Sequence, residues 1–268
     1  MQLKNKLSRL KSILAQSSSC LVAFSGGVDS AFLLKIASLV LPKNKIIAVT
    51  ANSATYPREE LLFAKKIART FGVRHKIINT AELNDPRFVS NPANRCYFCK
   101  QELFSKLKQI ARENKLKFTF DASNISDKSD FRPGSKAKKE LGIRSPLQEA
   151  GFTKADIRAL SKKMGLATWN KPSLACLASR IPYGTPISKP GLERVDRAEK
   201  ILRKLKFQQV RVRHYDGLCR IEVPRKDIPV LINRSHNLID KFKKLGYNYV
   251  IVDLEGYRTG SLNEVIKK

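Results

Sequence analysis

Residues 25–30 have the composition and the setting of a loop that binds phosphate. They lie between residues 20–24, which read as a short buried strand, and residues 31–40, which read as a helix. The loop consists of Ser25, Gly26, Gly27, Val28, Asp29 and Ser30. Amides at a helix start attract anions, the glycines let the backbone approach a phosphate closely, and the serines add hydroxyl donors. The lysine of a Walker loop is absent, which disfavours a kinase or ATPase of that type. The alternative is a glycine turn that only packs a helix against a sheet.

Three of the five cysteines are spaced for sulfur or metal chemistry. Cys96 and Cys99 form a C-x-x-C pair at the start of a predicted helix, and Cys176 lies in a later loop. No histidine has the spacing of a fourth zinc ligand, whereas three thiolates suit a four-iron four-sulfur cluster with one open iron. A redox-active dithiol and inert packing are the alternatives. For Cys20 and Cys219, which fall on apolar strand faces, we expect packing.

An arginine-rich hairpin is predicted at residues 209–223. Strand alternation places Arg211 and Arg213 on one face, and Glu222 falls on the same polar face across the hairpin. Two like charges on one face repel each other unless an anion or a carboxylate lies between them, and paired guanidinium groups suit a phosphate. Arg258, in a glycine loop after a later strand, offers a third arginine. Solvated strand charges are the alternative reading of this pattern.

The elements that position these residues alternate between strand and helix in the first part of the chain. Further strands are predicted at residues 45–50, 74–79 and 118–121, and helices from Pro57 and over residues 100–113 and 153–164. This order is typical of an α/β fold with a mostly parallel sheet covered on both faces. Ligands of such sheets bind at the carboxyl ends of the strands.

The pattern changes after Trp169. A proline-containing loop is followed by a predicted helix at residues 192–205, a hairpin turning at Asp216-Gly217 and a strand at residues 249–254. We therefore expect an α/β domain at residues 1–168 and a smaller α+β domain at residues 169–268.

Composition indicates a folded protein. The 268 residues are 42% hydrophobic, and no apolar run approaches the ~20 residues of a membrane span. Residues 1–19 lack the uninterrupted apolar segment of a secretion signal, so we expect a cytoplasmic protein with no membrane partner. The 52 basic and 23 acidic side chains give a formal charge of +29, which attracts polyanions such as RNA and nucleotides. Solvated, lysine-rich helix faces explain the same excess.

The Ser-Gly-Gly-Val-Asp-Ser loop resembles that of the ATP pyrophosphatase, or PP-loop, superfamily. Its members hold the β and γ phosphates of ATP there and cleave between the α and β phosphates. Nearly the whole chain is similar to the LarE family, ATP-dependent sulfur transferases that build the nickel pincer nucleotide cofactor. The likeness includes NPANRCYFCK, FRPGS at residues 131–135, RSPLQEAG at 144–151, KPSLACLASRIPYGTPI at 171–187, RVRH, and LEGYRTGS at 254–261.

This resemblance implies that residues 1–168 bind ATP and that residues 169–268 bind the substrate and transfer sulfur. It also implies a reaction and its cofactors. ATP, with Mg²⁺, adenylylates a carboxylate of pyridinium-3,5-biscarboxylic acid mononucleotide, and a sulfur nucleophile displaces AMP to leave a thiocarboxylate. The implied adenosine contacts are Thr50, Ala51, Asn52, Ala122, Ser123 and Asn124. For Asn52 and Asn124, hydrogen bonds to their own loop backbone are the alternative.

The resemblance also assigns roles to side chains beyond the ATP site. It implies a substrate-phosphate site at Arg211, Arg213 and Arg258 and metal contacts at Glu199 and Glu222. Cys176 matches the cysteine that gives up its own sulfur and becomes dehydroalanine in single-cysteine members.

The chain departs from that sacrificial pattern by adding Cys96 and Cys99, as in the three-cysteine branch of the family. We therefore expect Cys96, Cys99 and Cys176 to hold a 4Fe-4S cluster whose open iron presents a sulfide. The expected partners are ATP, an anionic phosphate-bearing small molecule, a sulfur donor protein and further copies of the chain in a homo-oligomer.

Three other functions remain open at this point. A tRNA thiolase of the same superfamily also joins this loop to paired cysteines, and the positive charge would suit RNA, although no RNA-binding appendage is recognisable. An amide-forming enzyme related to NAD synthetase would leave the cysteines unused. A non-catalytic nucleotide-binding module would need neither the thiols nor the arginine face.

Overall fold

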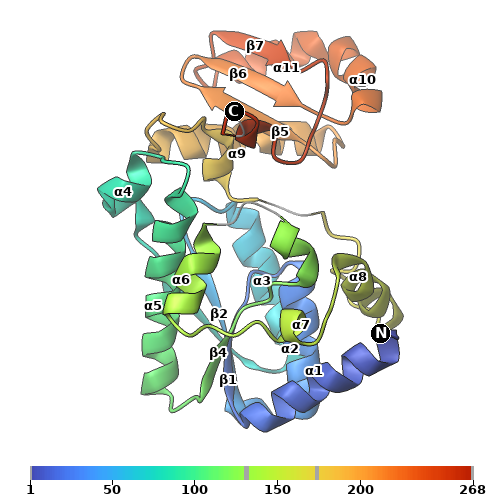
Figure 1. Ribbon diagram of the computed structural model, residues 1–268. Helices are drawn as coiled ribbons and strands as arrows, with labels where there is room; N and C mark the ends of the chain where they lie inside the picture. Colours follow the sequence, from blue (N-terminus) through green and yellow to red (C-terminus); the bar gives the residue numbers. More distant parts are fainter. Residues whose placement is uncertain (1, 130–132, 173–174, 267–268) are drawn as a thin grey trace. The chain divides into compact units, whose positions relative to one another are not determined.

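The computed structural model in Figure 1 describes residues 2–129, 133–172 and 175–266. It forms two compact units, one made of Met1–Glu82 and Asn94–Leu174 and the other of Leu83–Ala93 and Ala175–Lys268. The second unit therefore includes a short segment that precedes much of the first unit in the sequence. The predicted boundary between residues 168 and 169 divides the chain into two continuous parts, so it leaves this segment in the first part. The functions given to the two parts stay predictions. Phe131, Arg132, Ser173 and Leu174, which fall in two of the family-like segments, lie outside the described residues.

The first unit contains a four-stranded parallel sheet. Its strands are β1 (Cys20–Ala23), β2 (Ile46–Asn52), β3 (Arg74–Asn79) and β4 (Phe118–Phe120), in the order β3-β2-β1-β4. This confirms the predicted α/β class. Because the chain leaves β1 toward β2 and later returns to its other side with β4, the strand order reverses beside β1. Ligands of open α/β sheets bind at such a switch point, outside the carboxyl ends of the strands.

Helices cover both faces of this sheet, as predicted. Alternate residues of β1 and β2 point to opposite sides, so that Cys20 and Val22 face one core cluster and Leu21 and Ile47 face another. The first cluster packs against α1 (Leu3–Ser17), α2 (Val28–Val40), α3 (Arg58–Phe71) and α8 (Lys154–Lys163), and the second against α5 (Arg95–Glu113). Two shorter helices, α6 (Gly134–Glu140) and α7 (Pro146–Glu149), complete the unit.

The second unit is built on a three-stranded mixed sheet. β5 (Arg211–Tyr215) and β6 (Leu218–Glu222) form the predicted antiparallel hairpin, and β7 (Tyr249–Val252) runs parallel to β6. Asp216 has a φ of 54° in the turn between the first two strands, where a two-residue hairpin loop favours positive φ. The helices are α4 (Pro86–Val89), α9 (Lys189–Lys204), α10 (Ile228–Asn233) and α11 (Ser235–Lys243).

Hydrogen bonds hold the early segment of the second unit in place. The Asn91 side-chain amide donates to the carbonyls of Pro182 and Thr185 at 2.7 and 2.8 Å, and the Ile187 amide donates to the Val89 carbonyl at 2.8 Å. Such bonds fix α4 against the loop that follows Cys176 in the sequence. Within the described ranges, every helix is too short or too polar to cross a membrane.

Candidate active site

A cavity of about 300 Å³ opens at the carboxyl edge of the parallel sheet. Three segments that the sequence predicts as nucleotide contacts line it together: the loop after β1, the end of β2 and the residues after β4. The wall includes Ser25, Asp29, Ser30, Thr50, Ala51, Asn52, Asp121, Ala122 and Ser123, with Lys100 and Phe104 from α5 and Lys154 from α8. The cavity thus lies where the strand order reverses, and its lining combines backbone edges, hydroxyls and two lysines.

The loop after β1 is held in one shape by its own residues. Gly26 has a φ of +72°, and a Cβ built there would lie 2.9 Å from the Ala64 Cα in α3, so only glycine fits. The hydroxyl oxygens of Ser25 and Ser30 lie 3.1 Å apart, and Ser30 donates to the Gly27 carbonyl at 3.2 Å. Gly27 is the N-cap of α2, so the first amides of that helix point toward the loop with no partner inside the helix. This geometry makes an anion site without a lysine in the loop.

Asp29 is the carboxylate of this loop, and two side chains from distant segments contact it. The Lys154 ammonium forms an ion pair with Asp29, and the Asn124 side-chain amide donates to the same carboxylate at 3.3 Å. Asn124 also accepts a hydrogen bond from the Ser126 amide at 2.9 Å, which is the loop bond considered as the alternative for this residue. Asn124 is buried, and its hydrogen bond to Asp29 helps to hold the loop in place. Lys154 lines the cavity, and no sequence pattern had identified it.

Thr50, at the end of β2, is fixed by two hydrogen bonds. Its hydroxyl donates to the Phe24 carbonyl at 2.6 Å and lies 2.8 Å from His75 Nε2. Because the hydroxyl proton is committed to Phe24, His75 Nε2 is assigned as a donor to Thr50, which requires the Nε2-protonated ring. Burial, with repulsion from Lys65, lowers the pKa of His75 and keeps the ring neutral. These hydrogen bonds therefore hold Thr50 in a fixed position in the cavity wall.

The other expected adenosine contacts differ in how they are held. The Asn52 side-chain amide donates to Asn79 at 2.8 Å across to β3, and its side chain still lines the cavity. The Ser123 hydroxyl donates to Asp121, which also accepts from Ser145 at 2.5 Å. One carboxylate and two hydroxyl groups therefore form a hydrogen-bonded set beside the cavity. The roles of these residues toward adenosine stay predictions.

Cys96 and Cys99 lie in the first turns of α5, earlier than the predicted start of that helix at residue 100. Their spacing places the two half-buried thiols on one side of the helix. Lys100 follows them and lines the cavity. Burial works against the charge of Lys100, but attraction from Tyr56, Cys99, Asp121 and Cys96 raises its pKa above the ordinary value. The cysteine pair therefore adjoins the cavity wall through Lys100.

Cys176 belongs to the second unit. It is half-buried and caps the short 3-10 helix Leu177–Arg180, where its carbonyl accepts from the Ser179 hydroxyl at 2.7 Å. Among the described residues, no three histidine, cysteine or acidic side chains gather closely enough to hold a metal ion. The three-thiolate centre stays a prediction. By contrast, burial raises the pKa values of Cys20 and Cys219 to about 12, which agrees with their predicted packing role.

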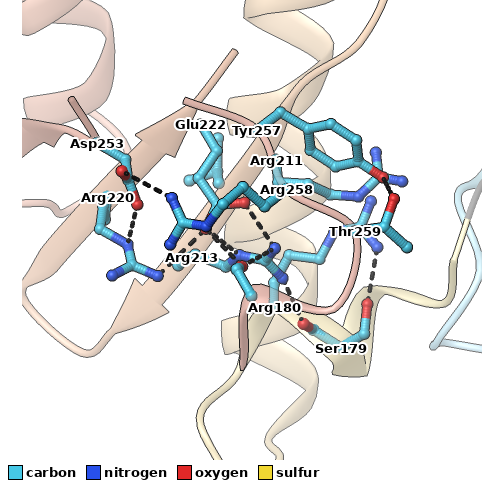
Figure 2. Close-up of polar contacts among 12 residues, drawn as sticks. Ser179, Arg180, Arg211, Arg213, Arg220, Glu222, Asp253, Tyr257, Arg258 and Thr259 are labelled. Atoms are coloured by element: carbon cyan, nitrogen blue, oxygen red, sulfur yellow. Dashed lines mark hydrogen bonds and ion pairs between the residues drawn. The ribbon is translucent and has the colours of Figure 1, made fainter. Parts of the chain in front are cut away.

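Arginines and carboxylates of the second unit form a buried network (Figure 2). Arg211 and Arg213 lie on one face of β5, and Arg213 makes two bonds to Glu222, at 2.8 and 2.6 Å. Ser261 donates to Glu222 at 2.9 Å, and Arg213 also donates to the Ser179 carbonyl at 2.9 Å. Glu222 also accepts from Arg220 at 3.2 Å, so this carboxylate is shared by Arg213 and Arg220.

Glu199, in α9, is also a carboxylate that accepts hydrogen bonds from arginines. It accepts from Arg180 at 2.7 and 3.0 Å, from Arg203 at 3.1 Å and from the Val212 amide at 3.2 Å. Burial alone would raise the pKa of Glu199, but the neighbouring arginines hold it below its ordinary value. Glu199 and Glu222 are fully buried, and guanidinium groups occupy their oxygens. This arrangement fits counter-ions for arginine, and the metal contacts expected at these two carboxylates stay a prediction.

The three arginines expected to bind a substrate phosphate differ in their surroundings. Burial, with repulsion from Arg180, lowers the pKa of Arg211 to about 10, and its guanidinium lies 5.2 Å from the Tyr257 ring centre. Arg258 is paired with Glu255 at 2.7 Å and Glu264 at 3.2 Å, and the hydrogen bond to Glu264 raises its pKa. The pKa values of Arg211 and Arg258 are therefore shifted in opposite directions.

The end of the first unit is tied directly to the phosphate loop. The Lys171 ammonium lies 2.7 Å from Glu60, 3.4 Å from the Gly26 carbonyl and 3.7 Å from the Phe63 ring centre. Arg158 donates to the Lys171 carbonyl at 2.9 Å. These contacts anchor the chain five positions before Cys176.

Comparison with known proteins agrees with this architecture. The model of a family described as queuosine biosynthesis protein QueC matches residues 19–90, which contain the first three strands and the loop. The chain is 41% identical over 268 residues to an uncharacterized protein of Synechocystis sp., covering 99% of this chain and 100% of that protein. It is 38% identical over 247 residues to the pyridinium-3,5-bisthiocarboxylic acid mononucleotide synthase of Lactiplantibacillus plantarum, covering 92% of this chain and 90% of that enzyme. An uncharacterized protein of Methanocaldococcus jannaschii is 28% identical over 257 residues, which cover 95% of this chain and 98% of that protein.

The parallel sheet, its glycine loop and these matches define an enzyme of the ATP pyrophosphatase class that inserts sulfur. Within that class, the chain belongs to the LarE family, which includes the Lactiplantibacillus synthase. The resemblance seen in the sequence motifs is thereby confirmed.

Proposed function

We propose that this enzyme uses ATP to adenylylate a carboxylate of pyridinium-3,5-biscarboxylic acid mononucleotide and converts it to a thiocarboxylate for synthesis of the nickel pincer cofactor. The observation that carries the proposal is the 38% identity to the Lactiplantibacillus synthase over 92% of this chain. The cavity at the sheet edge supports it, because its wall combines the loop after β1 with the end of β2 and the residues after β4, the segments that the family resemblance assigns to ATP.

In the first step a substrate carboxylate oxygen attacks the α-phosphorus of ATP. The bond between the α and β phosphates breaks, and pyrophosphate leaves with the bonding electrons. The loop amides at the start of α2 hold the leaving pyrophosphate, because the helix dipole and unpaired N–H groups stabilise the negative charge that develops there. Magnesium would be held beside Asp29, the carboxylate in the first turn of α2, and would neutralise part of that charge.

In the second step a sulfur nucleophile attacks the acyl carbon and AMP departs with the bonding electrons. We propose that Cys96, Cys99 and Cys176 hold the sulfur centre; a four-iron four-sulfur cluster bound there would supply a sulfide nucleophile. Two of these thiols support the proposal, because α5 presents Cys96 and Cys99 one turn apart next to the cavity. A sulfur donor protein would restore the sulfide after each turnover.

The substrate phosphate is proposed to bind at Arg211, with Arg213 and Arg258 as neighbours in the same network. Burial and Arg180 lower the pKa of Arg211, so a phosphate dianion placed there would relieve that repulsion. Glu199 and Glu222 hold the surrounding guanidinium groups in fixed positions.

The test is to incubate anaerobically purified enzyme with ATP and the pyridinium biscarboxylate and to analyse products by mass spectrometry. AMP, pyrophosphate and a thiocarboxylate should form together. Pyrophosphate release only with tRNA would instead support the tRNA thiolase. Amide formed from ammonia by a variant that lacks Cys96, Cys99 and Cys176 would support the amide-forming enzyme.

A further inference from the structure

The loop after β1 has no cation of its own, although ATP brings a triphosphate with several negative charges. Lys154 lines the cavity and forms a direct ion pair with Asp29, a residue of the loop. Its side chain is 32% exposed and that of Asp29 is 22% exposed, so water screens the pair only in part. Lys154 follows Asp29 by 125 positions. No motif of the loop reveals it.

The backbone of Lys154 is held firmly. Thr153 caps α8 through a reciprocal capping box with Asp156, which fixes Lys154 in the first turn of that helix. The Lys154 amide donates to the Ser126 hydroxyl at 3.2 Å, while Asn124 from the same loop donates to Asp29. The helix start, the loop after β4 and the phosphate loop are therefore connected by hydrogen bonds. A flexible ammonium on a rigid base can change its partner without moving the backbone.

We propose that Lys154 binds the β and γ phosphates of ATP, in place of the lysine that a Walker loop carries within its own sequence. Without nucleotide the ammonium stays with Asp29, which keeps a half-buried carboxylate paired. When the triphosphate binds, the ammonium moves to a phosphate oxygen, and Asp29 becomes available to the cation that accompanies ATP. This inference rests on ATP use in the proposed function and adds to it the residue that recognises the outer phosphates.

The experiment compares a nucleotide analogue that carries the β and γ phosphates with a nucleotide that lacks them. Binding of α,β-methylene ATP and of AMP is measured by calorimetry for the wild type, Lys154→Met, Lys154→Arg and, as a matched control, Lys163→Met. Lys163 lies exposed in the last turn of the same helix. Removing a charged hydrogen bond should weaken binding of the ATP analogue roughly 10- to 100-fold in Lys154→Met. AMP binding should change by less than about twofold, because AMP lacks the phosphates that Lys154 contacts. Lys154→Arg should recover part of the loss, and Lys163→Met should bind both nucleotides like the wild type.

Two outcomes for Lys154→Met would overturn the inference. Unchanged binding of the analogue would show that Lys154 does not contact the phosphates. Equal weakening of analogue and AMP would show that the lysine only supports the shape of the loop. These results leave the proposed function standing, because the assay needs neither the pyridinium substrate nor sulfur. A wild-type protein that binds no ATP analogue would instead overturn both.

Discussion

The two units hold charge in opposite ways. The phosphate loop of the first unit is lined by backbone amides and hydroxyls, and its carboxylate is paired with a lysine from a distant helix. In the second unit, buried arginines are matched by fully buried carboxylates in the same sheet and in α9. The loop thus offers the amides at the start of α2 to an anion, whereas the buried arginines Arg180 and Arg213 are already paired with carboxylates. From this difference we expect substitutions in the loop to lower activity more than stability. We expect substitutions in the arginine network to lower stability more than activity.

The largest effect is expected for Gly26→Ala. A Cβ at Gly26 would collide with the backbone of α3, and the residue has a positive φ, so the loop must shift. Pyrophosphate release should fall at least about 100-fold, since small displacements of a positioning loop have costs of that size. Gly27→Ala is the matched comparison, because a Cβ there would meet only the Ser25 hydroxyl, at 3.4 Å. If Gly26→Ala lost no more activity than Gly27→Ala, the close approach to α3 would not matter.

Glu222→Ala should destabilise the protein strongly. The substitution leaves the Arg213 guanidinium buried without its carboxylate, and breaking a buried ion pair from one side has a typical effect of about 3–5 kcal/mol on the free energy of unfolding. Urea denaturation measures it. Glu264→Ala serves as the control, because it breaks the exposed pair with Arg258 and should change the free energy of unfolding by less than about 1 kcal/mol. Similar values for the two variants would contradict the assignment of Glu222 as a buried counter-ion.

Arg211→Met should separate substrate binding from stability. Because neighbouring cations and burial disfavour the charge of Arg211, its loss should leave the melting temperature unchanged or higher. The KM for the phosphate-bearing substrate should rise about tenfold, the effect of one charged hydrogen bond, while the KM for ATP stays as in the wild type. An unaltered KM for that substrate together with a lower melting temperature would make Arg211 a structural residue.

A smaller, pH-dependent effect is expected for Glu199→Gln. The arginines lower the folded-state pKa of Glu199 below its unfolded value of about 4.5, so the ionised carboxylate stabilises the fold above that pH. This stabilisation disappears as the pH falls through the folded-state pKa. The difference in free energy of unfolding between wild type and Glu199→Gln should therefore shrink below pH 4.5, by about 1.4 kcal/mol for each unit of pKa shift. A difference that stayed constant down to acidic pH would contradict the lowered pKa.

Local patterns were sufficient to predict much of the first unit. Apolar runs predicted the strand at residues 74–79 with its observed bounds, and the glycine loop follows β1 as expected. The helix after it begins at Val28, three residues earlier than predicted, so the last three loop residues form its first turn. The hairpin of β5 and β6 and its polar face were also predicted, because alternation along a strand determines which side chains share a face.

Contacts between distant segments were not predictable in the same way. Lys154 reaches Asp29 from 125 positions away, and Lys171 reaches the Gly26 carbonyl from 145 positions away. An ion pair of this kind leaves no periodic signal in the sequence. The same reason explains why residues 83–93 were not expected in the second unit, and why the arginine partners of Glu199 and Glu222 were missed.

The central claim is that an acyl adenylate formed at the loop receives sulfur from a centre held by Cys96, Cys99 and Cys176. It is tested most directly by counting thiocarboxylate products per chain in anaerobically purified enzyme of known iron and sulfide content, with the mass of the Cys176 peptide followed in parallel. The account predicts more than one product per chain when sulfide is supplied, with iron bound and Cys176 intact. A single product per chain from iron-free enzyme, accompanied by conversion of Cys176 to dehydroalanine, would contradict it.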